Sequence, residues 1–231
     1  MSGSVLLIDL ASGNGRVDWP TLARHGIAGA WRKATEGATY NDPGFGPARQ
    51  AAHAAGVPLG AYHFARPDRN TAEAEAEHFC RMIGEVREHE LRPALDMEHP
   101  AGVDREEWER AVAKVDLEAW ARAFNHRVKA ELGVGPIFYS YSSFILEHVK
   151  PQHGPIGYGL WLAVYDRNDG AEHPFTVPPP WKRAVAHQFT SRARVAGVEG
   201  FVDLSSAPSL RPLLAHPTPL PPIGADLYPK H

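Results

Sequence analysis

The chain alternates short apolar runs with segments of helical periodicity. Over its first two thirds, apolar runs at residues 5–9, 27–33, 57–64, 91–98 and 136–140 are each followed by a helical stretch. The predicted helices cover residues 19–25, 47–55, 71–89, 105–132 and 142–149, and several are followed by a glycine, a common helix stop. Strands that alternate with helices in this way favour a parallel sheet.

The last third of the chain has a different pattern. Strand-like runs at residues 160–165, 184–189 and 201–204 are joined by Gly- and Pro-rich connections without helical periodicity. About eight strands, of which five are followed by helices, predict an α/β barrel that lacks part of its helical coat. An open doubly wound sheet is the alternative. Because Ser12-Gly-Asn-Gly-Arg16 only weakly imitates a Gly-x-Gly-x-x-Gly turn, a Rossmann-type nucleotide site is disfavoured.

The length of 231 residues suits one large α/β domain or two small ones. We predict a barrel domain over residues 1–214. The Pro-rich segment that begins near His216 can form neither a ladder nor a helix, so residues 215–231 are predicted to be an extended tail or linker.

Charge and apolar content narrow the classes of partner. The net charge is −3 with His neutral, so no basic excess indicates nucleic-acid binding. No apolar stretch reaches 18 residues, so we expect no membrane insertion. The first residues show no signal peptide, so we expect synthesis in the cytoplasm, or a leader that has been removed. The one cysteine, Cys80, lies on an apolar helix stripe and is expected to be a buried thiol.

Two carboxylates, Asp96 and Glu98, stand two residues apart at the end of an apolar run. Side chains at such positions of a strand share one face. Each charge raises the pKa of the other group, so one carboxyl can stay protonated while the other stays ionised. Glycoside hydrolysis requires this division of roles.

Other acidic and aromatic residues gather at the ends of successive predicted strands, where parallel barrels place their active sites. Carboxylates suit acid and nucleophile chemistry on acetals, and aromatic rings offer flat faces for sugars. Each residue taken alone could be an ordinary core or surface residue, but the set is unusual. It comprises Asp9, Lys33, Glu36, Tyr62, Tyr139, Trp161, Tyr165, Gln188 and Asp203.

Metal and cofactor motifs are weak in this sequence. Thirteen histidines are present, but they form no His-Glu-x-x-His pattern, and a single cysteine cannot make a paired-Cys site. A carboxylate cluster could bind Mg²⁺ or Ca²⁺ through its oxygens. We rank this below the glycosidase interpretation, and expect neither a metal nor a cofactor.

An ordered series of motifs resembles the glycoside hydrolase family 25 muramidases, the Chalaropsis-type lysozymes that include many phage endolysins. The series runs from about residue 5 to about residue 212. It comprises Asp9 after Leu-Leu-Ile, Val17-Asp-Trp19, Lys33-Ala-Thr-Glu-Gly37 with Tyr40 and Asp42-Pro43, Gly60-Ala-Tyr-His-Phe64, Leu95-Asp-Met-Glu98, Leu160-Trp-Leu-Ala163 and His187-Gln-Phe-Thr190. The resemblance implies an irregular, TIM-like (β/α)5β3 barrel. It also implies hydrolysis of the β-1,4 bond between N-acetylmuramic acid and N-acetylglucosamine in peptidoglycan.

The resemblance also implies roles for particular residues. Glu98 matches the general acid, and Asp96 matches the carboxylate beside it, which assists charge development. Asp9 and Asp203 match the flanking acids. The implied substrate contacts are Tyr62, Tyr139, Trp161, Gln188, Lys33 and Glu36.

Two departures from the family pattern bear on this assignment. Trp31-Arg32 precedes Lys33 where aliphatic residues are usual. Ser205 follows Asp203 where Asn is frequent, which makes Asp203 the weakest match of the four acids.

Several alternatives remain open at this level. The barrel could be a wall-binding module without turnover, or a glucosaminidase or chitinase-type enzyme. The Asp-x-Glu pair also occurs in family 18 chitinases, usually after a further Asp where this chain has Ala94. We expect a monomer that acts on glycan strands of the bacterial wall. We also expect it to be an endolysin released through a separate membrane pore, with a bacterial autolysin as the second possibility.

Overall fold

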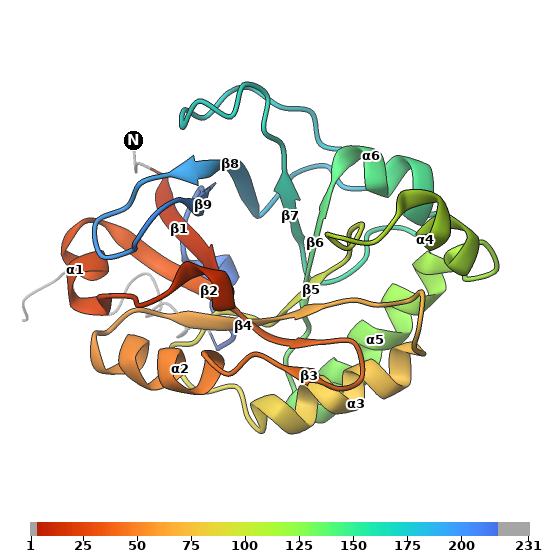
Figure 1. The fold of residues 1–231 in the computed structure, drawn as a ribbon, viewed down its shortest axis with the longest axis horizontal. Helices are drawn as coiled ribbons and strands as arrows, with labels where there is room; N and C mark the ends of the chain where they lie inside the picture. The colour runs from red at the N-terminus through yellow and green to blue at the C-terminus, as the bar shows by residue number, and fades with distance from the viewer. Residues whose placement is uncertain (1–3, 217–231) are drawn as a thin grey trace, which may run out of the picture.

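The computed structural model describes residues 4–216, and eight of its strands close into a barrel (Figure 1). Hydrogen bonds connect them in the order β1-β9-β8-β7-β6-β5-β4-β2, and β1 also pairs with β2. The strands are β1 (Val5–Leu10), β2 (Ile27–Glu36), β4 (Leu59–Phe64), β5 (Ala94–Asp96), β6 (Ile137–Tyr141), β7 (Leu160–Ala163), β8 (Ala186–Ala193) and β9 (Val202–Ala207). A short strand, β3 (Tyr40–Asn41), pairs with β2 alone.

The barrel combines parallel and antiparallel pairing. Neighbouring strands are parallel from β1 through β2, β4, β5, β6 and β7 to β8, whereas β9 runs antiparallel to both β8 and β1. The connections from β7 to β8 and from β8 to β9 contain no helix. The predicted barrel with a helix-poor last third is therefore confirmed, and the open doubly wound sheet is wrong.

The helices cover the strands of the first two thirds. They are α1 (Trp19–Arg24), α2 (Phe45–Ala54), α3 (Ala72–Ile83), α4 (Arg105–Val112), α5 (Leu117–Leu132) and α6 (Ser142–Phe144), which continues as a π-helical turn over Ile145–Val149. Short 3-10 turns lie at Ser12–Asn14 and Arg211–Leu213.

Two predicted helices are longer than the helices in the structure. The helix predicted over residues 105–132 is two helices, because Asp116 caps a new N-terminus by accepting a hydrogen bond from the Ala119 amide. The helix predicted over residues 71–89 ends at Ile83, where Gly84 adopts a positive φ of 71°. At both positions, local capping and backbone conformation determine where a helix ends or begins, although the helical periodicity of the sequence continues.

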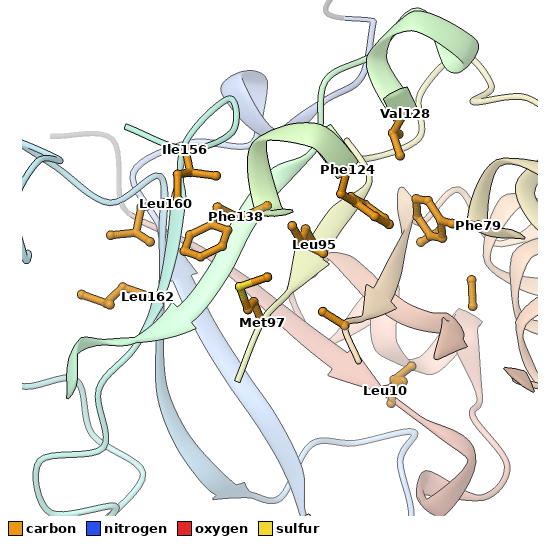
Figure 2. Close-up of a cluster of buried hydrophobic side chains, with 14 of the residues drawn as sticks. Leu10, Phe79, Leu95, Met97, Phe124, Val128, Phe138, Ile156, Leu160 and Leu162 are labelled. Atoms are coloured by element: carbon orange, nitrogen blue, oxygen red, sulfur yellow. The ribbon is translucent and has the colours of Figure 1, made fainter. Parts of the chain in front are cut away.

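Apolar side chains form a layer between the strands and the surrounding helices (Figure 2). Leu95 and Phe138 are fully buried there, as are Phe79 and Phe124 from the helices α3 and α5. A second cluster fills the barrel interior, where Trp31 stacks on Trp161 with ring centroids 4.3 Å apart. Cys80 is a buried thiol in the outer layer, as the sequence predicts.

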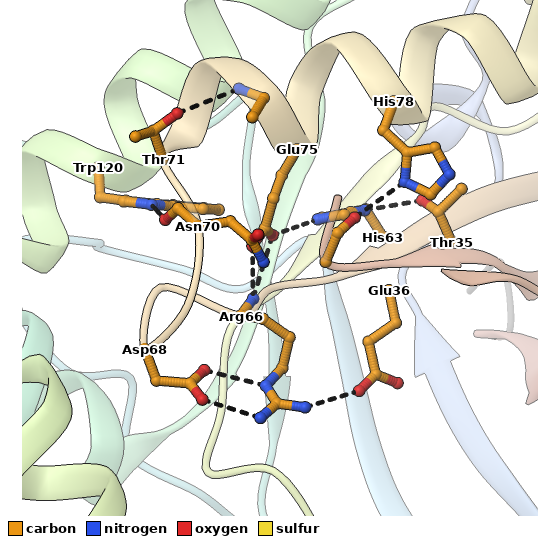
Figure 3. Close-up of polar contacts among 12 residues, drawn as sticks. Thr35, Glu36, His63, Arg66, Asp68, Asn70, Thr71, Glu75, His78 and Trp120 are labelled. Carbon is orange, nitrogen blue, oxygen red and sulfur yellow. Dashed lines mark hydrogen bonds and ion pairs between the residues drawn. The ribbon is translucent and has the colours of Figure 1, made fainter. Parts of the chain in front are cut away.

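A buried polar network joins β4 to α3 (Figure 3). His63 Nε2 lies 2.7 Å from Glu75 Oε2, and His63 Nδ1 lies 2.7 Å from Thr35 Oγ1. The Glu75 carboxylate also accepts hydrogen bonds from the Arg66 amide and from Asn70 Nδ2. Glu75 therefore fixes both the helix and the chain that leaves β4.

None of the helices within residues 4–216 combines the length and the apolar character that a membrane crossing requires.

Candidate active site

A cavity of about 360 Å³ opens at the carboxyl ends of the barrel strands. Four carboxylates and a single lysine contribute its charged groups, and aromatic rings contribute most of its remaining wall. The lining residues are Asp9, Lys33, Tyr62, Phe64, Asp96, Glu98, Tyr139, Trp161, Tyr165 and Asp203. All four predicted acids therefore face one space, although the sequence spreads them from position 9 to position 203.

The Asp96-Met97-Glu98 segment places two of these acids. The predicted strand over residues 91–98 is shorter in the structure, where β5 ends at Asp96. The alternation of side chains nevertheless continues, because Met97 is fully buried in the outer core while Asp96 and Glu98 line the cavity. The Met97 amide donates to the carbonyl of Tyr139 at 3.1 Å, which keeps this segment beside β6.

The antiparallel pairing of β1 with β9 places the other two acids. Asp9 and Asp203 are directly opposite each other in the β1–β9 register. Opposed residues of antiparallel strands hold their side chains about 5 Å apart on one face. Asp203, the weakest of the four sequence matches, is thus placed beside Asp9 by the strand register.

Burial raises the pKa of all four carboxyls, and the charges of neighbouring carboxylates add to this effect at Asp9, Asp96 and Glu98. Burial is the largest cause for Glu98, and the charge of Asp203 adds to it, while Lys33 acts in the opposite direction; together they raise its pKa to about 7. Burial likewise raises the pKa of Asp203 to about 6, and raises the pKa of Asp9 and Asp96 well above the usual range. Burial therefore raises the pKa of Glu98 more than the like charges do, whereas the prediction from the sequence relied on like charges.

Gln188 connects three lining residues from behind the cavity wall. Its Nε2 donates to Asp9 Oδ2 at 2.7 Å, and its Oε1 accepts from the Tyr139 hydroxyl at 2.8 Å and from the Tyr165 hydroxyl. Gln188 is almost fully buried and contacts the cavity through these partners. The hydrogen bond from Gln188 lowers the pKa of Asp9 and partly offsets the effect of burial.

Lys33 and Glu36 form an ion pair at the cavity wall. Lys33 Nζ lies 2.5 Å from Glu36 Oε2 and 4.5 Å from the centroid of the Phe64 ring. Arg66 pairs with Glu36 at 3.1 Å and with Asp68 at 2.8 Å (Figure 3). Lys33 therefore lines the cavity, whereas Glu36 lies behind it and holds the ammonium group.

The two departures from the family pattern are accommodated in the packing. Trp31 is fully buried in the barrel interior, and its Nε1 donates to the carbonyl of Arg92 at 2.9 Å. Arg32 is buried on the opposite face and pairs with Asp42 at 2.9 Å. Ser205 accepts a hydrogen bond from Trp161 Nε1 at 3.0 Å, which fixes the indole under the cavity.

Phe64 and Tyr165 both line the cavity, but they were not among the sugar contacts predicted from the sequence. Tyr165 follows β7 by two residues, so the strand-end rule that placed the other residues also singles it out. Within residues 4–216, no group of three or more His, Cys, Asp or Glu side chains is arranged to hold a metal ion.

Comparison with known proteins places this geometry in a family. Residues 8–198 match the model of glycosyl hydrolases family 25. Lysozyme M1 of Streptomyces globisporus is 30% identical over 200 residues, which cover 85% of this chain and 65% of that protein. The lysozyme of Streptococcus phage Cp-9 is 32% identical over 168 residues, which cover 71% of this chain and 45% of that protein.

A solved structure with a similar fold is also that of a lysozyme. The bacterial lysozyme from Streptomyces coelicolor superposes with a TM-score of 0.73 at 26% identity, over 90% of this chain and 94% of that one. The chain spans about half to two thirds of the length of the two curated relatives. Because the family model matches most of the chain, the protein belongs to glycosyl hydrolases family 25.

Proposed function

We propose that the protein is an N-acetylmuramidase that hydrolyses the β-1,4 bond between N-acetylmuramic acid and N-acetylglucosamine in peptidoglycan. The observation that carries the proposal is a half-buried glutamate, Glu98, whose pKa is raised to about 7 in a cavity with three further carboxyls. Membership of the family supports the substrate class, and the lysozymes among its relatives support the reaction.

Glu98 is the general acid in this proposal. A carboxyl with a pKa of about 7 is protonated in a large fraction of molecules near neutral pH. It can then donate its proton to the glycosidic oxygen as the bond breaks. Its conjugate base is stabilised by Lys33, whose charge lowers the pKa of Glu98.

The other carboxyls act on the positive charge that develops on the sugar. An oxocarbenium-like transition state is stabilised by anions that are already in place. Asp96 Oδ1 is buried and has no hydrogen-bond partner within residues 4–216. It can accept a hydrogen bond from the N–H of a 2-acetamido group and so orient that group for attack on the anomeric carbon. Direct attack of water with inversion is the competing route, and the anomer formed first, read by NMR, separates the two.

The aromatic lining provides the sugar contacts. Tyr62, Tyr139 and Trp161 come from β4, β6 and β7, and all three line the cavity. Tyr139 and Trp161 pack edge to face, with centroids 4.6 Å apart. Rings fixed in this way bind the apolar faces of sugars with little loss of side-chain entropy.

The bond specificity is tested by the new reducing end. Purified peptidoglycan is digested and reduced with borohydride, and the reduced sugar is identified by mass spectrometry. Reduced N-acetylmuramic acid is the expected product. Reduced N-acetylglucosamine would make the protein a glucosaminidase, and the absence of any new reducing end would favour a wall-binding module.

The assignment of Glu98 is tested by Glu98→Gln. The amide keeps the shape but cannot donate the proton, so we expect the turnover to fall by roughly 10²-fold or more. Glu77→Gln, at an exposed position of α3, is the matched control and should keep normal turnover. Near-normal activity of the Glu98→Gln enzyme would remove Glu98 from the mechanism.

A further inference from the structure

The β8–β9 hairpin carries an exposed cationic and aromatic surface at the rim of the cavity. We propose that Arg192, Arg194 and Phe201, here called the rim patch, bind the carboxylates of the peptide stem that muramic acid carries in peptidoglycan. The inference rests on the proposed function and extends it from the glycan to its peptide substituent.

Strand geometry places the rim patch beside the cavity. Phe201 immediately precedes β9, and side chains of a strand alternate between its two faces. Val202 is buried in the outer core, and Asp203 lines the cavity. Phe201 therefore lies on the cavity side of the strand, one step further out than Asp203, and the residue is 49% exposed.

The two arginines are gathered around this ring. The guanidinium carbon of Arg194 lies 4.6 Å from the Phe201 ring centroid, and that of Arg192 lies 5.7 Å from it. Both arginines are exposed, and neither takes part in an ion pair within the described part of the chain. Their N–H donors are therefore held near one another and remain available to an anion.

The backbone that presents the rim patch is tied to the neighbouring loop. Asn168 Oδ1 accepts hydrogen bonds from Thr190 Oγ1 at 2.7 Å and from the Ser191 amide at 3.0 Å. The Arg192 amide donates to Thr190 Oγ1 at 3.1 Å. Just before β9, the Phe201 carbonyl accepts a hydrogen bond from Asn14 Nδ2 at 3.5 Å. A fixed backbone reduces the entropy lost when an anion is bound.

Charge complementarity selects the occupant. The cavity itself contains four carboxyls and one lysine, so it disfavours additional negative charge. The substrate nevertheless brings such charge, because the lactyl group of muramic acid carries a peptide with free carboxylates. This peptide leaves the sugar close to the bond that is cleaved, so its carboxylates must lie just outside the cavity. The rim patch supplies unpaired positive charge at that position.

The test compares Arg192→Gln/Arg194→Gln with the wild-type enzyme on two forms of one wall preparation that has been stripped of teichoic acid. In one form the stem carboxylates are intact, and in the other they are converted to neutral amides with carbodiimide and methylamine. We expect the variant to lose about three- to tenfold in kcat/KM on the intact wall, mainly through KM, and to match the wild type on the amidated wall. Arg81→Gln/Arg127→Gln removes the same charge from exposed positions of α3 and α5 and should show no such difference.

The outcomes separate this inference from the proposed function. If the wild type releases no reducing ends from either wall, the proposed function fails. If it is active but the variant loses the same factor on both walls, or matches the control variant on the intact wall, the stem-binding inference fails. A loss that appears only on walls that retain teichoic acid would assign the rim patch to that polymer and would equally overturn the inference.

Discussion

At the scale of single residues, the position of Lys33 has the clearest consequence for pH dependence. Lys33 is the only cation among the residues that line the acidic cavity, and its charge lowers the pKa of both Glu98 and Asp96. Glu36, which Arg66 holds in place, keeps the ammonium group at the wall. The charge of one side chain thus helps to set the pH at which the acid loses its proton.

We predict that Lys33→Met moves the alkaline limb of the pH–rate profile to higher pH. The acid acts in its protonated form, so activity falls as the pH rises through the pKa of Glu98, which is about 7. Removing a nearby positive charge makes ionisation of Glu98 less favourable and raises that pKa. The measurement is kcat/KM on solubilised wall fragments across pH 5 to pH 9.

Lys33→Arg keeps the charge and is the matched control, with a limb close to that of the wild type. An alkaline limb that stays in place or moves to lower pH in the Lys33→Met enzyme would show that Lys33 does not tune Glu98. A loss of activity at every pH, without a moved limb, would leave Lys33 with a role in substrate binding alone.

Strand alternation predicts from the sequence which face of a strand a candidate side chain occupies. Asp96 and Glu98 follow from a spacing of two, and they line the cavity although the strand ends between them. Glu36 and Gln188 could not be placed in the same way. Whether such a residue faces the cavity or supports it from behind depends on partners such as Arg66 and Asp9, which are distant in the sequence.

At the scale of secondary-structure elements, the buried pair between β4 and α3 holds the outer layer on the barrel. Glu75 and His63 are fully buried, and burial lowers the pKa of His63. Their contact lies on the outside of the strand whose neighbouring residue, Tyr62, lines the cavity. Packing on one face of β4 therefore supports the site on the other.

We predict that Glu75→Ala destabilises the fold by about 3–5 kcal/mol, because it leaves several buried donors without their acceptor. The groups affected are His63, the Arg66 amide and Asn70 Nδ2. The free energy of unfolding, measured by urea denaturation, checks this value. Glu73→Ala, in the exposed first turn of the same helix, should change it by less than about 0.5 kcal/mol. Equal effects of the two substitutions would mean that the buried network contributes nothing specific.

Element boundaries were the least predictable part of the fold. Periodicity located the helical stretches, but it could not show that Asp116 begins a new helix or that Gly84 ends one. These decisions rest on a few backbone hydrogen bonds, which a pattern averaged over many residues does not resolve. The short strand β3 was missed because two residues carry no detectable alternation.

At the scale of the whole molecule, residues beyond the last strand seal the end of the barrel opposite the cavity. Leu213 is fully buried in the interior cluster, and its carbonyl accepts from the Arg92 amide at 2.7 Å. The Ala215 amide donates to the carbonyl of Glu90 at 2.9 Å. The chain therefore contacts the barrel as far as Ala215, and most of the predicted tail over residues 215–231 lies outside the described residues.

We predict that a chain cut after residue 216 keeps both its melting temperature and its wall-hydrolysing activity. A chain cut after residue 208 should lose about 2–4 kcal/mol of stability, because the apolar groups around Leu213 and Leu214 become exposed or are lost. Thermal unfolding followed by circular dichroism provides the measurement. If both cuts are equally harmful, residues 217–231 belong to the folded domain; if both are harmless, the seal at Leu213 is not needed.

The acid cluster includes Asp9 from the first strand of the barrel and Asp203 from β9, and this has a consequence for biosynthesis. Gln188 holds Asp9 across a separation of 179 residues, and Asp203 reaches Asp9 only when β9 inserts between β8 and β1. A nascent chain on the ribosome therefore lacks the complete cluster until β9 has left the exit tunnel. The activity is expected to appear in one step once β9 has paired with β8 and β1, with no partly active species before it.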